Sequence, residues 1–408
     1  MQGEISQKEK IPYRIVMITE DQSIFADSPA QKRIKAYGAV VEELYVIVLS
    51  RKNSGFAEKR LAENIWVYPT NSKHMFYAVS DAARTVKLAI RAKKVHLMVC
   101  ENPFRAGLAG WFVSRETGTP FEIQIPDDVF SPVFRSENLK NLACFYLAKF
   151  LLPKAQSIRA FSKRVKDSLY ENLHFEVGHI PYMYTLAPFV DVLAIRNFVP
   201  QKSLEEKYSE FVKIILIVSR FEKEKNVLLS IAALRMALSG NPNWGVVIVG
   251  GGSREKFLKK KVRKFGLISR IAFEPWTNKE DLISYFKTAS LFLSTANQSG
   301  FGKNLFMAAV SGCPTVTTEV GVVGAELSKE HLAVCDPKDA TCVYTRLSQM
   351  MNDSFSLSQL EGHAQILARD LPAVSADEHF AEVAAHWKKV ILAHPEAFSP
   401  TENPSESF

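Results

Sequence analysis

Cysteine is scarce in this sequence, and no two cysteines have the spacing of a metal site or a redox motif. The chain has 408 residues and five cysteines, at Cys100, Cys144, Cys313, Cys335 and Cys342. An odd, dispersed set without a CxxC pair is typical of buried thiols in a reducing compartment rather than of disulfides or zinc ligands. We therefore expect unpaired thiols and no bound metal.

Long apolar runs are also absent. No segment approaches the roughly 20 residues that a membrane-spanning helix needs, and the N-terminus lacks the apolar core of a signal peptide. We therefore expect a cytoplasmic protein. With 47% apolar and 23% charged residues, the composition is that of an ordinary globular protein. The exception is segment 399–408, rich in Ser, Glu and Pro, which we expect to be disordered.

Acidic residues are outnumbered, and the formal net charge is +8. This balance indicates anionic partners, such as phosphorylated substrates, nucleic acid or an anionic membrane surface. The basic residues are spread along the chain, and neither an aromatic RNA-binding strand nor a zinc finger is recognisable. We therefore expect no nucleic-acid partner.

Short β-rich runs alternate with helical patterns almost throughout, which predicts an α/β protein with doubly wound parallel sheets. In the first half we expect strands at 14–18, 44–49, 65–68, 95–99, 121–125 and 157–160, with helices at 30–37, 78–92, 105–115 and 163–172. In the second half we expect strands at 214–218, 245–249, 271–274, 290–294, 315–318 and 333–335, with helices at 227–238, 254–265, 279–288 and 303–310.

The length exceeds that at which a single hydrophobic core keeps growing, so two domains are expected. We predict an N-terminal domain at residues 1–191, a linker at 192–211 and a C-terminal domain at 212–375. Helical patterns at 357–371 and 376–392 follow the last predicted strand. The segment 376–392 is expected to cross back onto the first domain.

Residues 216–226, LIVSRFEKEKN, carry two cations between a predicted strand and a predicted helix. Ligands of open α/β sheets bind at the carboxyl ends of strands, and anions gain there from the helix dipole. Arg220 and Lys225 therefore form a candidate anion site. Taken alone, the pair is equally consistent with a solvated charged turn.

Two further strand-to-helix turns of the second half are rich in glycine: 249–253, VGGGS, and 297–304, NQSGFGKN. Glycines let a backbone approach a ligand closely and leave amides free at a helix N-terminus. For Gly250 and Gly251 a tight turn without a ligand is the simpler explanation. Trp276 ends the strand between these turns, where it could cover a nucleobase or pack half-buried.

The order and intervals of these segments resemble family 4 of the retaining glycosyltransferases across residues 214–336. In that family an Arg and a Lys spaced like Arg220 and Lys225 hold the pyrophosphate of a nucleotide-sugar. Segment 299–316 is similar to the family pattern EGFG, four residues, EA, then AxGxPV. Residues 101–111, ENPFRAGLAGW, are similar to an NPF segment of bacterial members. The resemblance implies the GT-B fold, in which two Rossmann-like domains face each other across a cleft.

The sequence departs from the family pattern at three positions. Family members usually have two glutamates eight positions apart, one near the donor sugar and one on the ribose hydroxyls, where this chain has Ser299 and Met307. Hydrogen bonds to charged groups contribute about 1.5–3 kcal/mol, so each loss corresponds to a roughly ten- to 150-fold weaker affinity. Pro126 replaces a histidine that several relatives place near the donor sugar.

The resemblance implies a hexosyltransferase that moves a sugar from a nucleoside-diphosphate sugar to a glycan or lipid-linked acceptor of the cell envelope or an exopolysaccharide. It further implies retention of the anomeric configuration, with no metal or other cofactor. Transferases of this kind mainly position groups and stabilise charge on the leaving diphosphate. Catalytic roles are expected for Arg220, Lys225 and Asp127, the last as a residue that orients the acceptor hydroxyl, although a strand-end Asp also fits a capping role. Donor contacts are expected from Gly250, Gly251, Trp276, Ser299, Gly300, Phe301, Gly302, Lys303 and Met307.

The departures keep a second reading open, in which the chain is a catalytically silent GT-B protein that acts as a glycan-binding or transferase-partner scaffold. A GT-B epimerase or phosphorylase ranks last, because neither an acid–base pair nor a cofactor lysine is recognisable.

Residues 138–166 mix Phe, Tyr and Leu with basic side chains, and no acid falls between Lys140 and Lys166. A basic, aromatic helix can lie in the headgroup plane of an anionic membrane, which would place the protein at the inner face of the cell membrane. A core helix with snorkelling lysines is equally consistent with this pattern.

Overall fold

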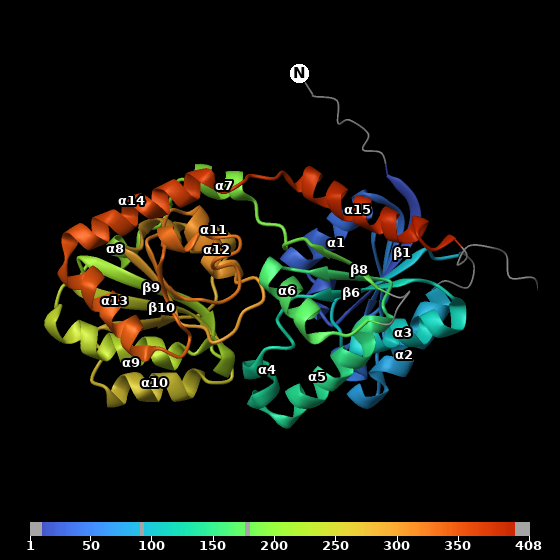
Figure 1. Ribbon diagram of the computed structural model, residues 1–408, viewed down its shortest axis with the longest axis horizontal. Coiled ribbons are helices and arrows are strands. Elements are labelled where there is room, and N and C mark those ends of the chain that lie inside the picture. Colours follow the sequence, from blue (N-terminus) through green and yellow to red (C-terminus); the bar gives the residue numbers. More distant parts are fainter. Residues whose placement is uncertain (1–9, 90–93, 176–179, 396–408) are drawn as a thin grey trace, which may run out of the picture.

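The computed structural model describes residues 10–89, 94–175 and 180–395, which form two α/β lobes side by side (Figure 1). Segment 399–408 and the last residues of the predicted helix 78–92 lie outside the described residues. Each lobe has a largely parallel sheet with helices on both faces. The predicted α/β class is therefore confirmed.

The N-terminal lobe contains an eight-stranded sheet in the order β3-β4-β2-β1-β5-β6-β7-β8. All neighbouring strands are parallel except β3 and β4, which pair antiparallel at the edge. The central strands are apolar and buried, as expected for a sheet covered on both faces. The strands are β1 (Ile11–Thr19), β2 (Val41–Val48), β3 (Lys59–Ala62), β4 (Ile65–Pro69), β5 (Leu97–Cys100), β6 (Phe121–Ile125), β7 (Ser157–Ala160) and β8 (Tyr182–Thr185).

Helices α1 (Pro29–Ala39), α2 (Ala78–Ala89), α3 (Arg105–Thr117), α4 (Pro132–Glu137), α5 (Leu139–Leu151) and α6 (Lys163–Asn172) belong to this lobe. Short 3-10 turns are η1 (Gln22–Phe25), η2 (Lys52–Ser54), η3 (Met75–Tyr77) and η4 (Leu152–Lys154). Strands β3 and β8 were not predicted. The sequence KRLA of β3 is polar because it forms an exposed edge, and the four residues of β8 are too few for a periodic signal.

The C-terminal lobe contains a six-stranded parallel sheet in the order β11-β10-β9-β12-β13-β14. Its strands are β9 (Lys213–Arg220), β10 (Trp244–Gly251), β11 (Ile271–Glu274), β12 (Leu291–Ser294), β13 (Thr315–Thr318) and β14 (Ala333–Cys335). Its helices are α9 (Val227–Ala237), α10 (Glu255–Lys264), α11 (Lys279–Thr288), α12 (Lys303–Val310), α13 (Ala340–Asn352) and α14 (Ser354–Asp370). The turns η5 (Lys223–Lys225), η6 (Leu238–Gly240) and η7 (Lys329–His331) complete it.

Segment 192–211 connects the two sheets and is ordered by packing. It forms α7 (Val192–Asn197) and α8 (Leu204–Lys207). Val192, Ile195 and Leu204 are buried in the core of the C-terminal lobe. The connection is therefore packed against the C-terminal lobe through both of its short helices.

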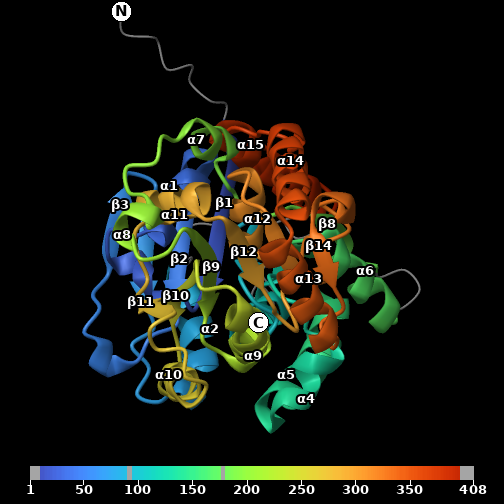
Figure 2. The same cartoon turned by 90° about the vertical axis from the view of Figure 1, so that its left-hand side faces the viewer.

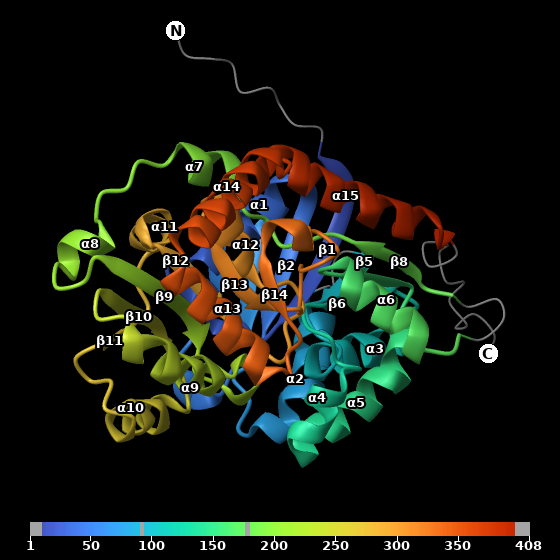
Figure 3. The same cartoon turned by 60° about the vertical axis from the view of Figure 1, so that its left-hand side comes forward.

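Helix α15 (Ala376–Leu392) leaves the C-terminal lobe and lies along the N-terminal one, beside α1 and β1 (Figures 1 and 3). Phe380, Val383 and Trp387 are buried in the same cluster as Ile15 and Met17 of β1. The chain thus crosses between the lobes twice, once through 186–192 and once before α15.

A buried polar network fixes α15 in place. The Glu122 carboxylate is fully buried and accepts hydrogen bonds from the Tyr184 hydroxyl at 2.9 Å and the Trp387 indole at 3.3 Å. The buried Arg159 guanidinium donates to the Leu186 carbonyl at 3.0 Å and the Tyr37 hydroxyl at 3.2 Å. Burial raises the pKa of Glu122, and Arg159 opposes this shift. Because each of these buried polar groups has a hydrogen-bond partner, the network favours a single position of α15 on the N-terminal lobe.

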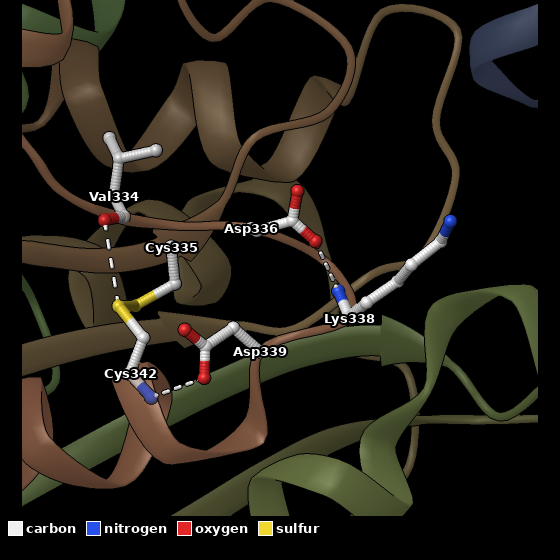
Figure 4. The surroundings of a disulfide bond; sticks show 6 residues. All are labelled: Val334, Cys335, Asp336, Lys338, Asp339 and Cys342. Carbon is white, nitrogen blue, oxygen red and sulfur yellow. Dashed lines mark hydrogen bonds between the residues drawn. A yellow bond between two sulfur atoms is a disulfide. The ribbon is translucent and has the colours of Figure 1, made fainter.

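The expectation of unpaired cysteines is wrong for one pair. Cys335, at the end of β14, forms a disulfide with Cys342 in the first turn of α13, with 5.8 Å between their Cα atoms (Figure 4). The turn from strand to helix brings the two together, which dispersed spacing does not reveal. Cys100, Cys144 and Cys313 are free thiols.

Among the described residues, no helix combines the length and the apolar composition that crossing a bilayer requires.

Trp387→Ala should destabilise the protein by about 3–5 kcal/mol, because it removes a fully buried ring and leaves a cavity. Trp387→Phe keeps most of the volume and loses only the donor to Glu122, so it should cost about 1–3 kcal/mol. Urea denaturation of both variants would measure this. Equal stabilities of the two variants would show that the indole packing does not anchor α15.

Candidate functional site

The two lobes meet at the carboxyl ends of their strands. The loop after β6 contacts the loop after β12: the Gly300 amide donates to Asp127 Oδ1 at 2.8 Å, and the Gln298 side chain donates to the Asp128 carbonyl at 2.7 Å. The Ser162 hydroxyl, at the N-cap of α6, donates to the Gly300 carbonyl at 2.7 Å. Both sheets therefore present their ligand-binding edges to a common crevice.

Glycine at position 300 is required by this approach. A Cβ at Gly300 would lie 1.7 Å from the Pro126 carbonyl oxygen and 2.6 Å from the Asp127 Cα atom. The two backbones therefore touch directly, and no other residue fits without moving the lobes apart.

The N-terminus of α6 adds charged contacts to the same interface. The Lys163 amide donates to Glu326 Oε1 at 2.8 Å. Arg164 forms an ion pair with Glu319 at 3.2 Å and donates to the Val323 carbonyl at 3.0 Å. These contacts close the crevice on one side.

A cavity of about 250 Å³ lies in this crevice and is lined by both lobes. Seven of the predicted site residues line it, namely Asp127, Arg220, Lys225, Ser299, Phe301, Gly302 and Lys303. The remaining lining residues include Pro126, Pro188, Ser219, Ser294 and Asn304. Asp127 is the acidic residue among those that line the cavity, and the three basic ones are Arg220, Lys225 and Lys303.

The end of β9 delivers the first two cations. Arg220 is its last residue and pairs with Glu224 at 3.2 Å, with 56% of its side chain exposed. Lys225 ends the η5 turn, and Asn226 follows in the left-handed conformation with a φ of 44°. The Lys225 ammonium donates to the Gln298 carbonyl at 3.2 Å. The turn therefore directs Lys225 into the cavity rather than into solvent.

Electrostatics at Lys225 favour an anionic ligand. Burial lowers the pKa of the Lys225 ammonium, the Asp127 carboxylate opposes this shift, and the Arg220 guanidinium adds to it. Burial also lowers the pKa of Lys303, with further contributions from Lys279 and Arg33. An incoming anion would raise the pKa of both lysines, because a nearby negative charge favours the ammonium form that loss of hydration disfavours.

Helix α12 begins at the cavity. Its N-cap is Gly302, whose φ of 84° favours glycine, and the cap has no side-chain hydrogen bond. The first helical residues, Lys303 and Asn304, line the cavity. Free amides at a helix N-terminus bind phosphate groups. The cavity therefore combines side-chain cations with backbone donors.

Five of the predicted site residues lie outside the cavity wall. The buried Met307 belongs to the core of the C-terminal lobe, and Gly300 forms the contact with Pro126. Gly250 and Gly251 end β10, and Trp276 lies beside a Cβ position at Gly251, with 3.7 Å to its indole nitrogen. Trp276 lines a second hollow of about 420 Å³, with Lys202, Lys207, Tyr208, Glu274, Pro275, Thr277, Asp281 and Tyr285.

Sequence reasoning missed the residues that join the lobes. Ser162, Arg164 and Glu319 come from segments with no motif, and their role follows only from the packing of one lobe on the other. Asn304 lies within the glycine-rich segment, and its side-chain Nδ2 atom donates to the Val218 carbonyl at 3.1 Å. Its position in the first turn of the helix predicted at 303–310 could have indicated that it lines the site.

Residues 201–365 match the family model for glycosyl transferases group 1. The chain is 30% identical over 188 residues to the lipopolysaccharide core biosynthesis mannosyltransferase LpsB of Rhizobium meliloti, which covers 44% of this chain and 52% of that one. The match spans between 15% and 57% of the length of the curated relatives, and 34% to 52% for most of those with the strongest similarity.

Two solved structures share the whole architecture. Sucrose-phosphate synthase from Thermosynechococcus elongatus superposes with a TM-score of 0.76 and 14% identity, over 93% of this chain and 100% of that one. HepE of Anabaena in complex with UDP-glucose superposes with a TM-score of 0.67 and 17% identity, over 92% of this chain and 100% of that one. The fold is therefore GT-B, as predicted, and the family match supports a glycosyltransferase of group 1.

Gly300→Ala should separate the lobes, because the added methyl group meets the Pro126 carbonyl and neither backbone can yield cheaply. We expect a loss of about 1–3 kcal/mol, as for overpacked sites, and a larger radius of gyration in X-ray scattering. Gly362→Ala, on α14 with nothing within 4 Å of the new methyl group, is the matched control. An unchanged radius of gyration in Gly300→Ala would refute the close contact between the backbones.

Proposed function

We propose that this protein is a retaining glycosyltransferase of family 4 that moves a sugar from a nucleoside-diphosphate sugar to an acceptor of the cell envelope or an exopolysaccharide. The observation that carries the proposal is the cavity between the lobes, where Arg220, Lys225 and the first turn of α12 converge. These groups fit a diphosphate, which carries more than one negative charge and several acceptor oxygens.

The charges explain how the leaving group is stabilised. When the bond between the anomeric carbon and the phosphate oxygen breaks, negative charge grows on the diphosphate. Arg220 and Lys225 neutralise that charge, and they are preorganised by the β9 strand end and the η5 turn. The acceptor oxygen bonds to the anomeric carbon on the same face, and its proton passes to the departing phosphate oxygen. The donor sugar then keeps its configuration.

Asp127 is proposed to orient the acceptor hydroxyl. It belongs to the N-terminal lobe, whereas the cations belong to the C-terminal lobe, so it stands on the acceptor side of the cavity. Its Oδ1 atom accepts from Gly300, which fixes the carboxylate. A fixed carboxylate can accept a hydrogen bond from a hydroxyl and hold it near the anomeric carbon.

Entry of the donor requires the lobes to part. The cavity of about 250 Å³ is smaller than the usual ligand pocket of about 300–1,000 Å³. Hinge motion between two lobes is a common way to admit a ligand and then exclude water. The described contacts at Gly300 and α6 fit the closed state of such a cycle.

The donor class is supported by the HepE structure, which holds UDP-glucose on the same fold. The acceptor class is supported by LpsB, which is named for lipopolysaccharide core biosynthesis. We propose a cytoplasmic location at the inner face of the cell membrane, and a reaction that uses no metal, with Arg220 and Lys225 in its place.

Arg220→Ala should weaken the binding of the preferred nucleoside diphosphate about tenfold or more, because a charge-assisted hydrogen bond is lost. Calorimetry with UDP, GDP and ADP would identify the base and measure the change. Arg346→Ala, which removes an exposed arginine from α13, is the matched control and should bind like the wild type.

Turnover is a separate measurement from binding. Release of nucleoside diphosphate from the matching nucleotide-sugar, with and without acceptor extracts, should be slower in Arg220→Ala at saturating donor. If no nucleoside diphosphate binds to the wild type, the transferase proposal is wrong. If one binds without any turnover of its nucleotide-sugar, the silent scaffold is the correct function.

A membrane contact through α5 is proposed on its exposed apolar side chains. Leu139 is 84% exposed, Tyr146 62% and Phe150 47%, and the Lys154 ammonium lies 4.5 Å from the Phe150 ring centre. Helices α4 and α5 project at the end of the molecule opposite α14 and α15 (Figures 1 and 2). A projecting helix with apolar and basic side chains fits an anionic headgroup region.

Leu139→Ser combined with Phe150→Ser should reduce binding to phosphatidylglycerol vesicles at least about fivefold, because less apolar surface is buried in the interface. Sedimentation with vesicles would measure it. Ile268→Ser, which changes a 65% exposed residue on the other lobe, is the control. Equal binding by all three proteins would rule out α5 as the contact.

A further inference from the structure

A basic hollow lies on the N-terminal lobe, apart from the cavity between the lobes. It has a volume of about 720 Å³ and is lined by Arg51, Lys52, Asn53, Lys73, His74 and Met75. Every ionisable side chain in this wall is basic. None of the six residues belongs to the wall of the interlobe cavity.

The backbone that carries these side chains is fixed by hydrogen bonds between two loops. The Ser72 amide donates to the Ser50 carbonyl at 2.9 Å, and the Lys52 amide donates to the Ser72 carbonyl at 3.0 Å. Ser50 and Ser72 are buried. These bonds extend the pairing of β2 and β4 beyond the strands, so the cations of both loops are held side by side.

Asn71 shapes the hollow through a left-handed turn. It has a φ of 46°, in the left-handed region that L residues other than Asn and Asp seldom enter. The Ser50 hydroxyl accepts from the Asn71 amide at 3.0 Å, and the Asn71 side chain donates to the Phe56 carbonyl at 2.9 Å. The turn at Asn71 brings Lys73 and His74 next to Arg51 and Lys52.

Three acids near this edge of the sheet have cationic partners. Glu101 pairs with Arg33 at 3.0 Å, and Glu20 pairs with Arg105. Asp81, on the helix that follows the hollow, pairs with Arg84 at 2.7 Å. The basic wall of the hollow therefore keeps its positive potential for a ligand.

The hollow lies at the same edge of the N-terminal sheet as Asp127, where the carboxyl ends of the parallel strands meet. It follows the carboxyl ends of β2 and β4, and Asp127 follows the carboxyl end of β6 in the same sheet. In the order β4-β2-β1-β5-β6, three strand spacings separate β2 from β6 and four separate β4 from β6, or roughly 14–19 Å at about 4.8 Å per spacing. An extended molecule could therefore occupy both places.

Aromatic side chains flank the hollow. Phe76 is 89% exposed and Tyr77 52% exposed, and their rings meet edge to face at 5.7 Å. Large exposed aromatic groups beside a polar hollow mark a binding surface. A flat ring next to cations suits a sugar that carries an anionic group.

We propose that this hollow is the acceptor's second binding site, and that it takes a phosphate ester group lying roughly 14–19 Å from the reacting hydroxyl, three to four strand spacings along the sheet edge. The proposal rests on the proposed function and names the acceptor class: a phosphorylated, extended glycan. Arg51, Lys52 and Lys73 bind the phosphate, and Phe76 and Tyr77 contact the adjoining sugar. The phosphate could belong to a water-soluble glycan or to a lipid headgroup, and the two sources are separated by experiment.

The test compares two variants that lose the same charge. The first combines Arg51→Ala, Lys52→Ala and Lys73→Ala in the hollow. The second combines Lys260→Ala, Arg263→Ala and Lys264→Ala, which are exposed on α10 of the other lobe. Calorimetry with glycerol 3-phosphate gives the affinity for a soluble phosphate ester. Both triple variants are also measured in a protein that carries Arg220→Ala. This substitution weakens anion binding in the interlobe cavity, so that the remaining binding reports on the hollow.

We expect the hollow variant to bind glycerol 3-phosphate at least about tenfold more weakly, and the α10 variant to bind like the wild type in either background. The phosphate belongs to a lipid if the wild type binds phosphatidylglycerol vesicles more strongly than phosphatidylcholine vesicles and does not bind glycerol 3-phosphate. In that case only the hollow variant should lose the preference for phosphatidylglycerol. Equal affinities of the two variants for both probes, or no binding of either probe by the wild type, would overturn the proposal.

Binding of nucleoside diphosphate separates this proposal from the transferase proposal. The hollow variant should keep the wild-type affinity for the preferred nucleoside diphosphate, because its residues are not in the interlobe wall. A protein that binds the phosphate ester at the hollow and no nucleoside diphosphate would retain the hollow as a site and lose the transferase assignment.

Discussion

The direct contact of two backbones at Gly300 and Pro126 governs the rest of the structure. Neither loop has a side chain between them, so the lobes approach until the Gly300 amide reaches Asp127 and its carbonyl reaches Ser162. This approach sets the volume of the cavity and brings Asp127 within the electrostatic range of Lys225. A larger residue at position 300 would change the distance between the acceptor side and the donor side, which is the distance that a transfer reaction must hold constant.

The second crossing of the chain keeps that geometry reproducible. Helix α15 is attached to the C-terminal lobe by sequence and to the N-terminal lobe by the buried Trp387 and its bond to Glu122. A hinge between lobes needs an anchor on each side, and buried, fully bonded groups make a rigid anchor. The contacts at α6 are few: the Ser162 hydroxyl bond to Gly300, the Lys163 amide bond to Glu326 and one half-buried ion pair between Arg164 and Glu319. Firm packing of α15 on the N-terminal lobe, together with few contacts at α6, would suit a reversible closure of the lobes.

The sequence predicted what depends on local pattern and missed what depends on the meeting of distant segments. Buried parallel strands and the two strand-end cations follow from apolar runs and turn chemistry, so β9, β10 and the η5 turn were found where they lie. The polar edge strand β3 lacked such a pattern, and so did the bonds of Ser162 and Arg164 across the lobes. The Cys335–Cys342 disulfide was missed because a count of cysteines does not describe the turn between a strand and a helix. The basic hollow was missed for the same reason, because Arg51 and Lys73 are brought together by pairing of β2 with β4.

The replaced glutamates change the charge of the cavity as well as its hydrogen bonds. In the family pattern that this chain resembles, acids stand at the positions of Ser299 and Met307. Here Ser299 lines the cavity as a neutral side chain, and Met307 is buried in the apolar core.

Three cations, Arg220, Lys225 and Lys303, line the described cavity together with the single carboxylate of Asp127. Without further acids, a diphosphate meets less repulsion at close range, where unit charges near a protein surface interact by about 4 kcal/mol at 4 Å. That gain is comparable to the loss of one or two hydrogen bonds to charged groups, about 1.5–3 kcal/mol each. On the proposed function, the substitutions would shift the basis of donor binding from the sugar and ribose hydroxyls toward the phosphates. Such a site would discriminate less between donor sugars than one that forms hydrogen bonds with their hydroxyl groups.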